Sequence, residues 1–165
     1  MDRPQRKNVR LKCFDYNTPG YYFITICTEE KRKLLCEIVG TGILDGPQTR
    51  FTKYGIVAQE QLEFMSDFYD DVKIDKYVVM PNHIHLLVRI IGTELDKTPD
   101  RNQMNNRISS FVGTFKRFCN RKYGRNIWQS RSHDHVVRGQ NDYQEIWAYI
   151  DNNPAKWAED RFYVQ

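Results

Sequence analysis

The spacing of apolar residues predicts alternating strands and helices along the chain. Residues 21–27 are aromatic and β-branched, which is typical of a strand. Apolar positions return at helical spacing over about 52–67 and most regularly over 108–119, where basic residues stand off the apolar stripe. The other expected elements are strands at 34–39, 72–80, 83–91 and 135–138 and a final helix at 141–153.

This order of elements, β(β)αββαβα, predicts the fold class. A split β-α-β motif of this kind forms an antiparallel sheet with helices packed on one face, the ferredoxin-like or RRM-like sandwich of α+β proteins. A length of 165 residues and a hydrophobic fraction of 40% suit a single domain with its own core. We therefore expect one catalytic domain at 20–165, ending in a functional helix, behind a basic N-terminal arm at 1–19.

Composition narrows the expected environment. No apolar stretch reaches membrane-spanning length, and no apolar block follows the basic N-terminus, so neither a signal peptide nor a membrane partner is expected. The cysteines show no Cys-x-x-Cys pairing and are widely spread, at Cys13, Cys27, Cys36 and Cys119. This pattern predicts reduced thiols in a cytoplasmic protein, not a zinc cluster or a disulfide framework.

Positive charge is concentrated in two segments, although the net charge is only +4. Such a distribution is expected of a nucleic-acid-binding protein, and Tyr123 and Trp128 beside the second segment could stack unpaired bases. A solvated helix face explains that second segment about as well on its own. The candidate DNA-binding residues are Arg6, Lys7, Arg10 and Lys12 in the first segment and Lys116, Arg117, Arg121, Lys122, Arg125, Arg131 and Arg138 in the second.

Two histidines, His83 and His85, stand at alternate positions of a predicted strand, directly after Pro81-Asn82. Alternate side chains of a strand emerge on the same face, so the two imidazoles should project side by side. Two parallel imidazoles on a rigid element form half of a site for a divalent metal. On the polar face of an edge strand the two histidines could equally be solvated, so the pair by itself does not establish a metal site.

The last predicted helix carries a tyrosine and an asparagine on one face. Tyr149 and Asn153 are four residues apart and lie away from the apolar stripe. The residues expected to face the core are Tyr143, Ile146, Trp147 and Ile150. A tyrosine hydroxyl can attack a phosphate that a metal polarises, and two histidines with one amide oxygen would hold Mg²⁺ or Mn²⁺. Alternatively, Tyr149 is an ordinary flank residue and Asn153 belongs to a helix stop before Pro154.

Taken together, these segments resemble the single-tyrosine HUH transposases, specifically the REP-associated tyrosine transposases. A Met-Pro-Asn-His-hydrophobe-His run, followed some sixty residues later by Tyr-x-x-x-Asn-Pro, is highly specific for that group. The matches run in the family's order over nearly the whole chain, at 21–28, 77–87, 115–117, 128–129, 134–138 and 149–154.

The resemblance implies roles for four residues. His83 and His85 would be the metal-binding pair, Asn153 the third ligand of Mg²⁺ or Mn²⁺, and Tyr149 the nucleophile. Relatives cleave and rejoin single-stranded DNA near small hairpins through a 5′-phosphotyrosine link, and they need no nucleotide cofactor because each step conserves the phosphodiester. They are bacterial, cytoplasmic and nucleoid-associated, and they include monomers and homodimers in which the partner supplies the tyrosine.

Some features leave alternatives open. Ser132-His133 stands where relatives carry aromatic residues, and His133 and His135 receive no firm role. A domesticated protein that binds hairpin DNA without turnover is a second possible function, although it would not need all four site residues. A metal hydrolase built from four histidines is a third, but no acidic residue closely follows the His-x-His pair.

Overall fold

A central antiparallel sheet organises the molecule, a computed structural model that describes residues 18–40, 46–92 and 107–164. The sheet has the order β4-β5-β1-β6, and every neighbouring pair is antiparallel. Its strands are β1 (Gly20–Cys27), β4 (Val72–Val79), β5 (His83–Ile90) and β6 (His133–Val136). The predicted basic residues at 1–12 lie outside the described residues.

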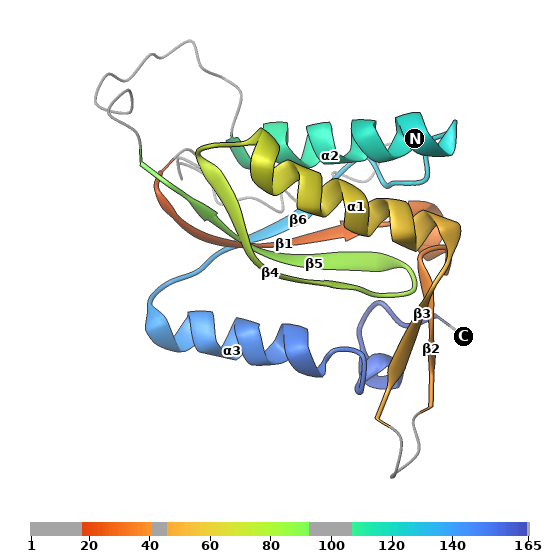
Figure 1. Ribbon diagram of the computed structural model, residues 1–165. Coiled ribbons are helices and arrows are strands. Elements are labelled where there is room, and N and C mark those ends of the chain that lie inside the picture. Colours follow the sequence, from red (N-terminus) through yellow and green to blue (C-terminus); the bar gives the residue numbers. More distant parts are fainter. Residues whose placement is uncertain (1–17, 41–45, 93–106, 165) are drawn as a thin grey trace, which may run out of the picture.

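The helices cover the two faces of this sheet unequally (Figure 1). On one face lie α1 (Lys53–Phe68) and α2 (Arg107–Tyr123), and on the other lies α3 (Gln140–Asn152). The α+β split β-α-β sandwich predicted from the sequence is confirmed, and the structure adds that the C-terminal helix has a face of the sheet to itself. Among the described helices, none has the length and hydropathy needed to cross a bilayer.

Smaller elements join the main ones. The strand predicted at 34–39 is shorter than expected and pairs with an unpredicted strand in a separate hairpin, β2 (Cys36–Val39) with β3 (Gln48–Phe51). Two 3-10 turns, η1 (Glu29–Lys31) and η3 (Trp157–Glu159), follow β1 and α3 respectively. Both turns lie beside the candidate site described below.

Alternate side chains along β5 belong to two different hydrophobic cores, one on each face of the sheet. Ile84, Leu86 and Val88 are fully buried in the large core beneath α1 and α2. Leu87 points to the opposite face, where it is buried with Ile146 and Ile150 of α3. Burying a large aliphatic side chain is worth about 1.5–3 kcal/mol, so the many residues of the first core provide most of the stability. Helix α3 is therefore held by a much smaller apolar contact.

Trp147 is a correction to the sequence prediction, which placed it in the core. Its side chain is 36% exposed, and the Lys76 ammonium lies 4.1 Å from its ring centroid. The buried residues of α3 are Ile146 and Ile150, four residues apart. Trp147 is about 100° further round the helix, where it reaches edge strand β4 and has no second layer to enter.

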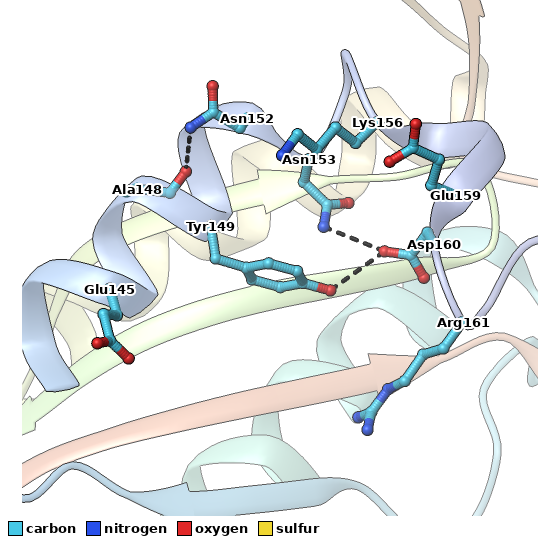
Figure 2. A pocket seen from close by; sticks show the side chains of 9 residues that line it. All are labelled: Glu145, Ala148, Tyr149, Asn152, Asn153, Lys156, Glu159, Asp160 and Arg161. Carbon is cyan, nitrogen blue, oxygen red and sulfur yellow. Dashed lines mark hydrogen bonds between the residues drawn. The ribbon is translucent and has the colours of Figure 1, made fainter.

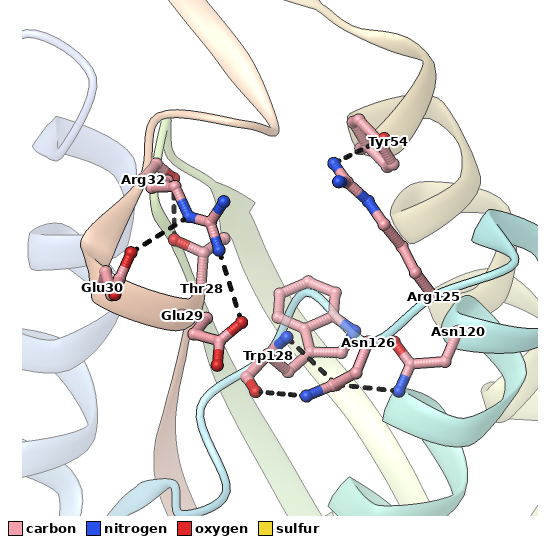
Figure 3. A network of polar contacts seen from close by, with 9 residues as sticks. All are labelled: Thr28, Glu29, Glu30, Arg32, Tyr54, Asn120, Arg125, Asn126 and Trp128. Carbon is pink, nitrogen blue, oxygen red and sulfur yellow. Dashed lines mark hydrogen bonds and ion pairs between the residues drawn. The ribbon is translucent and has the colours of Figure 1, made fainter.

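Trp128 and Tyr123 are also not the open stacking surfaces that the sequence suggested. Trp128 is 1% exposed and packs on Phe115, while its backbone N–H and C=O are both bonded to the Asn126 side chain (Figure 3). The Tyr123 hydroxyl donates to the Tyr54 carbonyl oxygen at 2.6 Å. Trp128 is part of the large core and is unavailable to bases, and Tyr123 is partly buried against that core.

Helix α1 begins against the backbone of residue 35, and this packing generates a stability prediction. A Cβ on Gly55 would overlap the carbonyl group of Leu35, which already accepts the Thr52 N–H. We expect Gly55→Ala to lower the free energy of unfolding by about 1–3 kcal/mol, measured by urea denaturation, because neither backbone can yield. Gly113→Ala in α2 meets open space and should instead stabilise by roughly 0.5–1 kcal/mol. Equal effects of the two changes would contradict this account.

Candidate active site

The two histidines of β5 lie on the face of the sheet that α3 covers. Both side chains are fully buried, and their Nε2 atoms approach to 3.0 Å. Strand β5 is paired on both sides, with β4 and with β1, so its backbone is fixed. The structure thus brings His83 and His85 together as the period-two spacing predicted, but in an interior position on a central strand and not on a solvated edge.

The proton on His83 is placed by Asn82. The Asn82 amide nitrogen donates to two carbonyl oxygens, at 2.8 Å to Phe162 and at 3.2 Å to Lys31, so its Oδ1 must be the atom that meets His83 Nδ1 at 2.8 Å. An amide oxygen can only accept, which puts the proton on Nδ1. The Nε2 lone pair of His83 therefore points at His85 Nε2, 3.0 Å away, as is usual where a neighbouring group fixes the proton of a metal-binding histidine.

Burial keeps both imidazoles neutral. It lowers the pKa of His83 to about 4, an effect that Asp160 opposes and that Arg161 and Lys31 reinforce. Burial and the neighbouring His83 hold the pKa of His85 well below its ordinary value. At neutral pH both rings therefore offer uncharged nitrogen donors, the form that binds metal.

Tyr149 reaches this pair from α3 in the same chain. Its hydroxyl lies 3.3 Å from His85 Nε2 and donates to Asp160 Oδ2 at 3.1 Å (Figure 2). The ring is 40% exposed and stands edge-on to Phe23, with centroids 6.0 Å apart. Burial, and then the charge of Asp160, raises the pKa of the Tyr149 phenol, so the group is protonated at neutral pH.

Asn153, one turn along the helix, shares a partner with Tyr149. Its amide nitrogen donates to Asp160 Oδ2 at 3.1 Å. Its Oδ1 is buried and has no hydrogen-bond partner among the described residues. The predicted common face of Tyr149 and Asn153 is thus present, and it leaves one buried, unpaired carbonyl-type oxygen, which suits an oxygen donor to a cation.

Asp160 is the site residue that sequence reasoning missed. Its Oδ1 accepts the Phe162 N–H at 2.6 Å, while its Oδ2 accepts from both Tyr149 and Asn153. His83, His85 and Asp160 each offer one potential metal-ligand atom, and these three atoms lie within 4.8 Å of one another. No spacing rule joins a carboxylate on the C-terminal segment to histidines on β5, so the chain's path alone brings them together.

A pocket of about 520 Å³ opens above these groups (Figure 2). Its walls come from α3, which carries Tyr149, and from the segment that follows, which carries Asp160 and Arg161. Two imidazole nitrogens with carboxylate and amide oxygens suit a divalent cation. Tyr149, Asn153 and Asp160 line the pocket, whereas His83 and His85 are buried behind its lining residues. An anion in the pocket would lie beside Tyr149 and Arg161, which both line it.

The predicted basic residues of the second segment lie apart from this centre. Arg117, Arg121 and Lys122 are exposed on α2, on the opposite face of the sheet, and Arg125 donates to the Tyr54 hydroxyl at 2.8 Å (Figures 1 and 3). Arg131 and Arg138 are exposed at the two ends of edge strand β6. The basic groups thus pass from α2 around the β6 edge toward α3.

Lys116 differs from the other basic residues of the second segment. Its ammonium donates to the Gln129 carbonyl oxygen at 2.8 Å and to that of Arg131 at 3.4 Å. Burial lowers the pKa of Lys116 to about 8. Lys116 therefore ties α2 to the loop before β6, which is a structural role.

The second His-x-His pair lies elsewhere. His133 and His135 are exposed on β6, and His135 Nε2 meets Asp142 Oδ2 at 3.0 Å. In the part of the chain that the structure describes, neither belongs to a group of potential metal ligands. The four histidines are thus two separate pairs.

Comparison with known proteins supports the fold. The chain has the fold of a REP-associated tyrosine transposase, as the resemblance predicted: it superimposes on a solved structure of such a transposase bound to a REP hairpin with a TM-score of 0.64 and 20% identity, covering 94% of this chain and 77% of that one. It belongs to the same family as an uncharacterized protein of Haemophilus influenzae, which is 30% identical over 96% of this chain and 93% of its own length. No protein-family model matches the chain.

The neutral histidines generate a pH prediction. The folded-state pKa of His83 lies below the ordinary value of 6.5, so unfolding takes up a proton. The contribution of the neutral histidine to the free energy of unfolding is therefore fully present above pH 6.5 and is lost as pH falls toward about 4. For the metal-free protein we expect each histidine to steepen this loss by up to about 1.4 kcal/mol per pH unit. Urea denaturation across this range measures it.

A matched variant isolates the histidines from their charged neighbours Asp160, Arg161 and Lys31. His83→Gln/His85→Gln retains all three and should show a shallower pH dependence of unfolding free energy than the parent. Parallel pH profiles for the two proteins would contradict the assignment of buried neutral imidazoles.

Proposed function

We propose that this protein is a transposase-type enzyme that cleaves and rejoins single-stranded DNA near hairpins, with Tyr149 as the nucleophile. The observation that carries the proposal is the position of the Tyr149 oxygen, 3.3 Å from His85 Nε2 and bonded to Asp160, within one chain. A phenol fixed beside a metal-binding set is the constellation needed for covalent phosphoryl transfer.

The metal site proposed for this enzyme uses more donors than the sequence indicated. His83, His85 and Asp160 would hold Mg²⁺ or Mn²⁺, with the orphaned Asn153 Oδ1 as a further oxygen donor. Once bound, such a cation polarises a phosphate and stabilises the charge that develops on it. Two imidazoles in the set favour Mn²⁺, whereas cellular abundance favours Mg²⁺.

The chain's own residues orient the nucleophile and provide a route for its proton. The Tyr149 hydroxyl donates to Asp160 Oδ2, which directs the oxygen toward the histidine pair and can receive the proton. As the tyrosine oxygen bonds to phosphorus, the bond from phosphorus to the 3′ oxygen breaks. That oxygen takes a proton from water and leaves as a 3′-hydroxyl, and Asp160 returns the tyrosine proton to water. The 5′-phosphotyrosine keeps the phosphodiester energy, so a 3′-hydroxyl can later reverse the step without a nucleotide cofactor.

The geometry supports catalysis by a single chain. Tyr149 and both histidines come from the same molecule, and α3 is seated on its own sheet through Ile146 and Ile150. A homodimer that exchanges tyrosines is therefore not required for a complete site, and we propose action in cis.

The proposed substrate is single-stranded DNA that contains a REP-like hairpin. The solved transposase with this fold is bound to a REP hairpin, and the exposed arginines on α2 and at the ends of β6 offer phosphate contacts. Nucleoid association in a bacterial cytoplasm follows from such a substrate. A domesticated hairpin binder without turnover is less well supported, because it would not need a nucleophile held against a metal-binding set.

A metal hydrolase is the second candidate, and one observation favours it. Asp160 supplies the carboxylate that the sequence lacked near the His-x-His pair, so the site could hold a metal that activates water. In that case Tyr149 would only orient substrate, and DNA would be cut without a covalent link to protein.

The nucleophile assignment is tested by trapping the covalent adduct. With a hairpin oligonucleotide and Mn²⁺, the parent protein should give a protein–DNA adduct on a denaturing gel. Tyr149→Phe should lower adduct formation by at least about a thousand-fold while DNA binding persists, because the ring remains and the attacking oxygen is gone. Cleaved DNA that survives in Tyr149→Phe would favour the hydrolase, and shifted but uncut DNA with the parent would favour the pure binder.

The basic face is tested by the salt dependence of binding. In the Tyr149→Phe background, the triple variant Arg117→Gln/Arg121→Gln/Lys122→Gln should flatten the slope of log affinity against log salt, by about 0.7 to 0.9 for each phosphate that is no longer neutralised. Lys116→Gln is the matched control, because that ammonium is bound to two carbonyls and should leave the slope unchanged. An unchanged slope in the triple variant would remove α2 from the DNA-binding surface.

A further inference from the structure

A second group of cations surrounds the aromatic C-terminal segment next to the candidate site, and one of them, Arg161, also lines the pocket. The Lys31 ammonium lies 5.3 Å from the centroid of the Phe162 ring, and the Arg161 guanidinium carbon lies 4.6 Å from the same centroid. The Lys33 ammonium lies 5.3 Å from the centroid of the Tyr163 ring. We call these residues, Lys31, Lys33, Arg161, Phe162 and Tyr163, the C-terminal strip.

The strip is anchored to the metal-binding histidines. The Phe162 ring is buried with its centroid 4.6 Å from that of His83. Asn82, which sets the proton on His83, also donates to the carbonyl oxygens of Phe162 and Lys31 and so ties both halves of the strip together. The strip is therefore a rigid extension of the site and not an independent surface.

The charges of the strip lack acidic partners in the part of the chain that the structure describes. Among these residues, Lys31, Lys33 and Arg161 form no ion pair, whereas the neighbouring Arg32 is bonded to Glu29 and Glu30 (Figure 3). The remaining acidic groups nearby are Asp160, which serves the site, and Glu159 on the pocket rim with Lys156. Three cations without acidic partners, beside the candidate site, favour the binding of an anionic polymer.

The strip also offers an aromatic face. Tyr163 is 38% exposed and stands edge-on to Trp157, with ring centroids 5.2 Å apart, and the Trp157 centroid lies 6.0 Å from that of His83. Exposed rings interleaved with cations form the usual binding surface for unpaired nucleotides, where bases stack and phosphates pair. Trp128 and Tyr123, which the sequence suggested for this purpose, are occupied in the core.

We propose that the C-terminal strip binds the unpaired DNA nucleotides that adjoin the scissile phosphate, with Tyr163 stacking a base and Lys31, Lys33 and Arg161 contacting phosphates. This inference rests on the proposed function for the position of the scissile phosphate. The strip holds the single strand in line with the pocket, while the arginines of α2 and β6 contact DNA further away.

Equilibrium binding tests the strip without needing the chemistry. In the Tyr149→Phe background, affinity for a fluorescein-labelled oligothymidylate is measured by fluorescence anisotropy. Tyr163→Ala should weaken binding roughly 5- to 150-fold, the range expected for losing one stacked base, and Tyr163→Phe should retain it because the ring is kept. Lys33→Gln/Arg161→Gln should flatten the salt slope by about 0.7 for each phosphate that the removed charge had neutralised.

Phe68→Ala is the matched control, because Phe68 is 52% exposed on α1, across the sheet from the strip. It should bind like the parent, and thermal melting should show that all variants remain folded. The proposal is overturned if Tyr163→Ala binds the oligothymidylate as tightly as the parent, or loses no more affinity than Phe68→Ala does. It is also overturned if Tyr163→Ala loses as much affinity for blunt duplex DNA as for the single strand. An adduct from the unmutated protein together with unchanged Tyr163→Ala binding overturns the strip alone. The absence of any adduct counts against the proposed function alone.

Discussion

The strict alternation of side chains along strand β5 is the constraint on which the rest of the structure depends. Ile84, Leu86 and Val88 fill the large core on one face, and this fixes His83 and His85 on the other. A slip of one residue in the register would send the imidazoles into the apolar core and take the aliphatic side chains out of it, at a cost of several kcal/mol. The hydrophobic effect thus holds the two nitrogen donors in place, although neither contributes to the large core.

Asn82 and Asp160 convert this fixed pair into a site. Asn82 links the η1 turn, the C-terminal segment and His83 through three hydrogen bonds, and it directs the Nε2 lone pair of His83 toward His85. Asp160 gathers the end of α3, through Tyr149 and Asn153, around the same point. Because α3 has only a small apolar contact with the sheet, these polar contacts are what align its tyrosine, and the geometry of the site depends on them.

Exposed positive charge lies on both faces of the central sheet. The exposed arginines of α2 lie across the sheet from Tyr149, whereas the cations of the C-terminal strip lie beside His83. A DNA substrate that contacts both has to pass around an edge of the sheet, and Arg131 and Arg138 at the ends of β6 lie along such a path. Folded duplex and unpaired strand would then meet different surfaces of one small domain.

The sequence by itself determined the fold class, the histidine pair and the shared face of Tyr149 and Asn153, because these follow from the local periods of strands and helices. It could not indicate Asp160, seventy-five residues beyond His85, or the burial of Trp128, since both arise from contacts between segments distant in the chain. Trp147 shows the same limit: its helical angle predicted a core position, but an edge strand left nothing there to cover it. Periodicity fixes which way a side chain points on its own element, and only the packing of elements decides what it meets.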